Sequence, residues 1–102
     1  MKRLALALAA AALFAGTATA AEHTVEIKGM RFTPADLRVD AGDTVMFVNR
    51  DGTPHTATAT GGAFDTGRLD KNESARVAIN AGRTFEYFCA VHPSMRGRIA
   101  AK

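Results

Sequence analysis

Three side chains that can bind a metal stand at three-residue intervals near the C-terminus, and they are Cys89, His92 and Met95. They offer a thiolate, an imidazole and a thioether. A fourth ligand would have to come from elsewhere in the chain, and His55, which lies between Pro54 and Thr56 in a turn-rich stretch, is the candidate. The pattern therefore predicts a metal site that forms only when folding brings two distant loops together.

The types of these donors favour copper. Thiolate and thioether are soft ligands that suit Cu(I), imidazole suits Cu(II), and a Cys-His-His set with a weak axial Met is the blue-copper arrangement. A coordination geometry intermediate between those that Cu(I) and Cu(II) prefer needs little rearrangement when an electron arrives or leaves. The ligand set therefore predicts electron transfer. Zinc also accepts Cys and His in tetrahedral geometry. The thioether favours copper over zinc.

Each of these residues has an ordinary structural explanation when it is considered alone. His55 alone would be a solvated loop histidine, Met95 alone would pack in the core, and Cys89 alone would be an inert buried thiol. Their combination at this spacing favours a metal site. His23 matches no ligand position, and we expect it at the surface or at the edge of the core.

The first twenty residues have the composition of a secretory signal peptide. Lys2 and Arg3 precede an apolar run over residues 4–15, and the small residues Ala18-Thr19-Ala20 follow. We expect this leader, residues 1–20, to be removed on export to the periplasm and residues 21–102 to form a single domain. The apolar run of about twelve residues is shorter than the roughly twenty of a membrane-spanning helix, so no membrane span is expected in the mature chain. An uncleaved membrane anchor is the alternative.

Composition excludes several partners and sites. Loss of Lys2 and Arg3 with the leader reduces the 13 basic residues of the 102-residue chain to 11, against 10 acidic residues. A mature chain so close to neutral, without clustered Lys and Arg, is not expected to bind nucleic acid. The only cysteine is Cys89, so neither an internal disulfide nor a binuclear copper centre with two cysteines can form.

Alternation of apolar and polar residues predicts strands along most of the mature chain. Residues 44–49 carry apolar side chains on both faces, which is typical of a central strand. In residues 84–89 the spacing places Phe85, Tyr87 and Cys89 on one face, so the thiol should point into the core. Turn residues recur about every eight to twelve positions, and no convincing helical period is present. The prediction is an all-β fold, a small antiparallel Greek-key β-sandwich.

An enzyme is not expected. A Cys-His pair also occurs in thiol nucleophiles, but such an enzyme needs an accessible, activated thiolate with an oriented base. Since Cys89 is predicted to point into the sandwich, it does not meet this requirement.

Several short segments of the mature chain match one known family: Val25-Glu26-Ile27, Phe32-Thr33-Pro34, Ala41-Gly42-Asp43-Thr44-Val45, Asn49-Arg50, Pro54-His55, Tyr87-Phe88-Cys89, His92-Pro93 and Met95-Arg96-Gly97. With the short ligand loop, the chain resembles the cupredoxins of the plastocyanin-azurin family, and most of all the amicyanin branch. The resemblance implies one copper ion with His55, Cys89 and His92 as strong equatorial ligands. Met95 would be the weak axial ligand. One departure is Thr56, because family members commonly carry Asn there to support the loop and the thiolate.

The resemblance also implies a function. A cupredoxin of this kind would carry single electrons between transient redox protein partners of the dehydrogenase or cytochrome c type, and we expect a monomer. His92 would carry the electron out through an edge ringed by Val91, Pro93 and Pro54, a small patch that suits weak docking. The alternative from another class is a copper trafficking or storage module. Trafficking sites tend to be open and rich in Met or paired Cys. The ligand set predicted here instead combines four ligands of mixed type.

Overall fold

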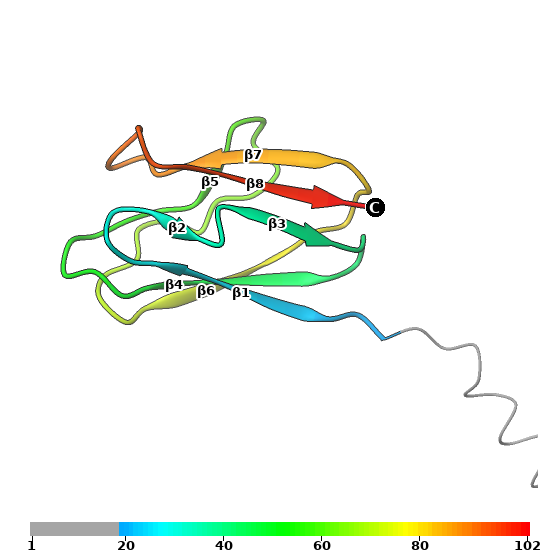
Figure 1. Ribbon diagram of the computed structural model, residues 1–102, viewed down its shortest axis with the longest axis horizontal. Helices are drawn as coiled ribbons and strands as arrows, with labels where there is room; N and C mark the ends of the chain where they lie inside the picture. The colour runs from blue at the N-terminus through cyan, green and yellow to red at the C-terminus, as the bar shows by residue number, and fades with distance from the viewer. Residues whose placement is uncertain (1–18) are drawn as a thin grey trace, which may run out of the picture.

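A computed structural model describes residues 19–102, and these form two four-stranded sheets packed face to face (Figure 1). The first sheet has the order β2-β1-β4-β6, with strands Phe32–Thr33, Glu22–Ile27, Thr44–Asn49 and Ser74–Ala78. The second has the order β3-β8-β7-β5, with strands Asp36–Val39, Arg96–Ala101, Thr84–Phe88 and Thr58–Ala59. The predicted all-β sandwich is confirmed. Apart from Thr19 and Ala20, the expected leader lies outside the described residues.

The two sheets are mixed rather than purely antiparallel. β1 pairs with β4 in parallel register, and β3 pairs with β8 in parallel register. The remaining pairs, such as β4 with β6 and β7 with β8, are antiparallel. The chain leaves the first sheet after β2, forms β3 in the second sheet and returns as β4, so β4 can run in the same direction as β1. Alternation in a sequence reports the two faces of a strand but not its direction.

The predicted central strand is central in the structure. β4 lies between β1 and β6, with Val45 and Phe47 fully buried and Val48 and Asn49 also buried. Burial on both faces explains why its residues are apolar nearly throughout. Among residues 19–102 no helix is long and apolar enough to cross a membrane.

Tyr87 on β7 is at the centre of the core. Its ring meets those of Phe32 and Phe47 edge-on, with centroid separations of 4.7 Å and 5.3 Å, an arrangement that aromatic pairs prefer. Gly97 lies opposite Tyr87 on β8, and a Cβ atom at that position would clash with the Tyr87 ring. Two residues of the segment between β5 and β6 also contribute to the core: Leu69 is buried, and Phe64 packs against Phe47 and Tyr87.

The sandwich brings both predicted ligand loops to one end. β4 and β7 end on the same side of the molecule, so the loop that follows β4 and the loop between β7 and β8 lie near each other at the left of Figure 1. The first loop carries His55 and the second carries residues 89–95. β1 begins at the opposite end.

Candidate metal centre

His55, Cys89 and His92 converge at the end of the sandwich, as the spacing predicts. The Sγ atom of Cys89 lies 3.6 Å from Nδ1 of His55 and 3.9 Å from Nδ1 of His92. The two Nδ1 atoms lie 3.2 Å apart. The same ring nitrogen of both histidines therefore faces the thiol, and the three atoms form a compact triangle.

The size of this triangle fits a metal ion at its centre. A metal such as zinc has bonds of about 2.0 Å to nitrogen and about 2.3 Å to sulfur, so trigonal donors around it would stand about 3.5 Å apart for two nitrogens and about 3.7 Å apart for nitrogen and sulfur. The three separations between His55, Cys89 and His92 lie within a few tenths of an ångström of these values. Two imidazoles and one thiolate are also the donor types that the blue-copper arrangement uses.

Cys89 is fully buried, and the backbone around it is held on both sides. Phe85, Tyr87 and Cys89 share the buried face of β7 and its extension, so the predicted inward thiol is confirmed. The backbone amide of Thr56 points at Sγ from 3.4 Å, an interaction that stabilises a thiolate. The amide of Cys89 donates to the carbonyl of Met95 at 3.1 Å, which closes the ligand loop on itself.

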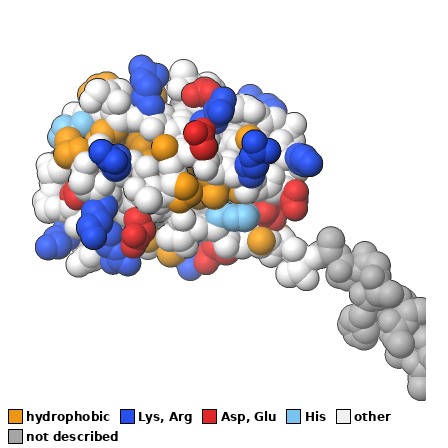
Figure 2. Space-filling view, in the orientation of Figure 1, with side chains coloured by type: hydrophobic (Ala, Val, Ile, Leu, Met, Phe, Trp, Pro, Cys, Tyr) orange, Lys and Arg blue, Asp and Glu red, His pale blue; other side chains and the backbone are white. Residues whose placement is uncertain are grey.

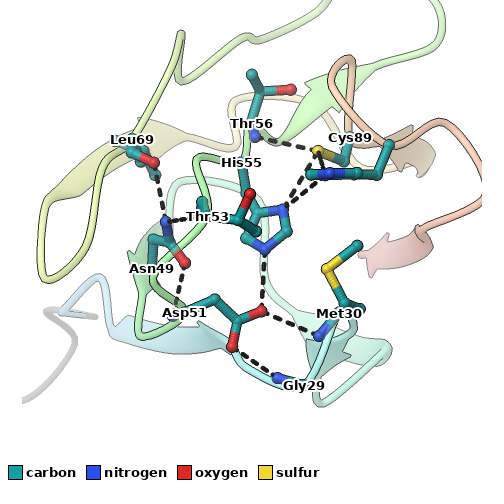
Figure 3. A network of polar contacts seen from close by, with 10 residues as sticks. Gly29, Met30, Asn49, Asp51, Thr53, His55, Thr56, Leu69 and Cys89 are labelled. Atoms are coloured by element: carbon teal, nitrogen blue, oxygen red, sulfur yellow. Dashed lines mark hydrogen bonds and ion pairs between the residues drawn. The ribbon is translucent and has the colours of Figure 1, made fainter.

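His55 is buried completely, and its ring is held from the side opposite the thiol. Its backbone exchanges two hydrogen bonds with Leu69, at 3.1 Å and 2.8 Å. Its Nε2 atom lies 2.9 Å from a carboxylate oxygen of Asp51 (Figure 3). A carboxylate at Nε2 accepts the ring proton there, so Nδ1 keeps its lone pair for a metal.

Asp51 is a functional residue that the sequence reasoning missed. Its two oxygens accept hydrogen bonds from the amides of Gly29 at 2.8 Å and Met30 at 3.0 Å, and these donors lie beside it in Figure 3. The amide of Met30 is the main cause that lowers the pKa of Asp51, so the group is ionised at neutral pH. The one signal in the sequence was that an acidic residue stands four positions before His55. An acidic residue in this turn-rich segment is explained equally well by its turn propensity.

Asn49, at the end of β4, holds the turn that carries Asp51 and His55. Its side-chain amide donates to the carbonyls of Thr53 and Leu69, both at 2.9 Å, and its oxygen accepts from the amide of Asp51 at 2.9 Å. Asn49 is fully buried, so each of these bonds satisfies a group that has no access to water. This network fixes the first ligand loop.

Thr56 takes a structural role at the position where the resemblance implied an Asn. Its hydroxyl oxygen accepts a hydrogen bond from the amide of Ala90 at 2.8 Å, which ties the first ligand loop to the residue after Cys89. Thr58 donates its own hydroxyl to Asp65 at 3.1 Å, so the 2.9 Å contact between the two threonines has Thr56 as the donor. The side chain of Thr56 therefore joins both loops.

His92 and Met95 complete the predicted set but occupy different surroundings. His92 is partly exposed, whereas Met95 is 5% exposed and packs with the core. The amide of Met95 donates to the carbonyl of His92 at 2.9 Å, so a tight turn links them. The structure thus places three predicted ligands in one cluster and the fourth on the buried side of the same loop.

Comparison with known proteins agrees with this geometry. The sequence model of the cupredoxin-like domain family matches residues 3–101. Amicyanin-alpha of Methylorubrum extorquens is 32% identical over 102 residues, which covers 94% of this chain and 86% of that protein. Amicyanin of Paracoccus denitrificans is 34% identical over 83 residues, and the match covers 76% of this chain but 63% of that protein. Plastocyanin of Pisum sativum is 28% identical.

Solved structures show the same fold. A reduced amicyanin variant superposes with a TM-score of 0.75 at 28% identity, covering 86% of this chain and 88% of that one. A copper-containing nitrite reductase from Thermus scotoductus superposes with a TM-score of 0.74 at 29% identity, but the match covers 22% of that larger protein. The likeness to the reductase is therefore a likeness to one part of it.

Fold, donor set and comparisons define a class, the small copper-binding β-sandwich. The chain belongs to the cupredoxin-like family, and its relatives include amicyanins and plastocyanins. Cupredoxins bind one copper ion, and copper is the cofactor of this chain, with His55, Cys89 and His92 as its candidate ligand cluster.

Proposed function

We propose that this chain is an exported type 1 copper protein that carries single electrons between other redox proteins. In this proposal His55, Cys89 and His92 are the equatorial ligands and Met95 is the axial ligand. The observation that carries the proposal is the triangle of two Nδ1 atoms and one Sγ atom, with spacings of 3.2 Å to 3.9 Å. The kinship with amicyanins and plastocyanins supports it.

Copper, when bound, would supply a centre that gains and loses one electron. The chain supplies a rigid set of contacts that keeps the ligand side chains from rearranging. His55 is fixed by Asp51 and by the backbone of Leu69, and Cys89 is fixed by the amides around it. Because these contacts are buried and satisfied, the ligand side chains keep their positions when the charge of the site changes.

His92 would offer bound copper a partly exposed edge through which an electron could leave. Val91 is 44% exposed beside it, Pro93 is exposed and Pro54 is partly exposed. Figure 2 shows hydrophobic side chains beside a histidine at the end of the sandwich where the ligand loops lie. A small apolar patch of this kind suits brief docking of a dehydrogenase or a c-type cytochrome by a monomeric carrier.

Export is part of the same proposal. Residues 1–20 would act as the signal peptide, and residues 21–102 would work in the periplasm as one domain. The segment from Lys2 to Ala20 carries a basic start, an apolar run and a small-residue cleavage site, which supports this assignment.

Electrochemistry of the copper-loaded mature protein tests electron transfer against copper trafficking. We expect reversible one-electron cycling in which the metal content after many cycles stays at one copper per chain. The buried Cys89 and His55 support this expectation, since neither is open to a metal acceptor. Rapid loss of copper on reduction would instead favour a trafficking or storage module.

A further inference from the structure

The start of β1 places two nitrogen donors around one buried carboxylate. The backbone nitrogen of Ala21 donates to Oδ1 of Asp43 at 2.9 Å, and Nε2 of His23 lies 2.8 Å from Oδ2 of the same residue. The hydrogen bond from Ala21 is the main cause that lowers the pKa of Asp43 to about 2. Asp43 is therefore an acceptor at neutral pH, and in the neutral imidazole of His23 the proton sits on Nε2.

This tautomer leaves the other ring nitrogen of His23 with a free lone pair. Nδ1 of His23 makes no hydrogen bond within residues 19–102, and the side chain is 26% exposed. A histidine whose far nitrogen donates to a carboxylate is the arrangement that metal-binding histidines commonly use. His23 lies on β1, which begins at the end of the sandwich opposite the copper site (Figure 1), so it takes no part in that site.

Removal of the proposed leader would change the chemistry of this strand end. Cleavage after Ala20 makes Ala21 the first residue, so the chain would begin Ala21-Glu22-His23 with a free amine. A free amine, two following amide nitrogens and an imidazole at the third position can form linked chelate rings in one plane. Square-planar nitrogen donors suit Cu(II) and Ni(II).

We propose that the processed chain binds a second divalent metal ion, Cu(II) or Ni(II), at this terminus. The ligands are the amine of Ala21, the amide nitrogens of Glu22 and His23, and Nδ1 of His23. The terminal ammonium group of Ala21 and the two amides each pass a proton to water when the ion binds. Nδ1 is the ring nitrogen that can reach back to its own backbone, and Nε2 can stay on Asp43. The inference rests on the proposed cleavage after Ala20.

The strand end is placed so that it can be released for this binding. β2 pairs with β1 only at Glu26 and Ile27, so among the described strands the start of β1 has a neighbour, β4, on one side only. Ala21 and Glu22 are exposed. A cleft of about 380 Å³ is lined by Ala21, His23 and Asp43 among others, and it leaves room for an ion. Binding exchanges the contact of Ala21 with Asp43 for metal ligation, and it also separates Glu22 and His23 from Thr44 and Val45, their partners on β4.

The test uses the exported protein with copper already in the His55–Cys89 site and nickel(II) sulfate as the probe. Mass spectrometry first establishes the N-terminus. One equivalent of nickel is then added, unbound metal is removed by gel filtration, and nickel per chain, the visible band of square-planar Ni(II) and the blue copper band are measured together. We expect one nickel per chain with the blue band unchanged. The blue band depends on the copper site alone. A protein that lacks the copper site can therefore be told apart from one whose terminus does not bind nickel.

Two variants decide whether the terminus is the site. His23→Gln removes the imidazole, and one glycine placed ahead of Ala21 keeps every side chain but moves His23 from the third to the fourth position. Both should lose the bound nickel and keep the blue band. Nickel retained by the glycine-extended chain, or a mature terminus other than Ala21, would overturn the proposal.

Discussion

Asp51 shows how one residue outside the ligand set can control a metal site. Three donors converge on its carboxylate, namely Nε2 of His55 and the amides of Gly29 and Met30. An amide side chain has only one oxygen, so Asp51→Asn leaves donors unpaired and frees the His55 ring. We expect copper affinity to fall about 10- to 100-fold in a competitive titration.

The matched control for this prediction is Asp36→Asn. Asp36 is exposed on β3, where it pairs with Arg98 away from the ligand loops. Its variant should bind copper as the unaltered chain does. Equal affinities for the Asp51 and Asp36 variants would show that Asp51 does not orient His55.

Substitution of Thr56 is expected to change the stability of the protein rather than its blue absorption. Thr56→Val keeps the shape and the backbone amide that faces Cys89, but it removes the hydroxyl that accepts from Ala90. We expect the free energy of unfolding to fall by about 1 kcal/mol, measured by chemical denaturation of the metal-free protein. Thr56→Ser keeps the hydroxyl and should lose less. An equal loss in both variants would contradict a role for the hydroxyl.

Met95 is expected to tune the copper site without being needed to hold copper. Met95→Leu keeps a buried apolar side chain of similar size at a position that is 5% exposed, so the loop should fold as before. Leucine donates no electron density to the metal, and the more highly charged Cu(II) depends on such donation more than Cu(I) does, so the reduction potential should rise while copper stays bound. Voltammetry measures this shift, and an unchanged potential would remove Met95 from the ligand set.

Among the strands, the antiparallel pairing of β7 with β8 depends on Gly97. Its missing side chain makes room for the Tyr87 ring, and a Cβ there would clash with that ring. Gly97→Ala should lower the free energy of unfolding by about 1–3 kcal/mol, because the core must shift to accept the methyl group. Thermal denaturation measures the effect.

Gly61→Ala is the control, because a Cβ at Gly61 meets nothing within 4 Å. Its variant should melt close to the unaltered protein. If Gly97→Ala also melts there, the account of the core around Tyr87 is wrong.

Strand faces could be predicted from the sequence, whereas strand directions could not. Period-two spacing correctly placed Tyr87 and Cys89 inward, since alternation follows directly from the pleat of a strand. The parallel pairing of β1 with β4 depends on how the chain crosses between sheets, which no local pattern records. The same division holds at the site. The spacing of Cys89 and His92 was enough to predict that both belong to the site. The contact of Asp51 with His55 depends on the tertiary path of the turn, so no spacing could predict it.

At the scale of the whole molecule, the sandwich separates two kinds of chemistry. The ligand loops and the patch around His92 occupy one end, and the start of β1 with His23 and Asp43 lies at the other (Figure 1). A partner that docks over His92 therefore leaves the proposed terminal metal site free. The core between them, centred on Tyr87, keeps both ends in place.

The central claim is that Cys89, with His55 and His92, forms a type 1 copper site. The most direct test is the visible spectrum and copper content of the copper-loaded mature protein beside its Cys89→Ser variant. We expect one copper per chain and an intense blue absorption that depends on the thiolate, with no blue band in the variant. A Cys89→Ser protein that stayed blue, or a copper-loaded parent without the band, would contradict it.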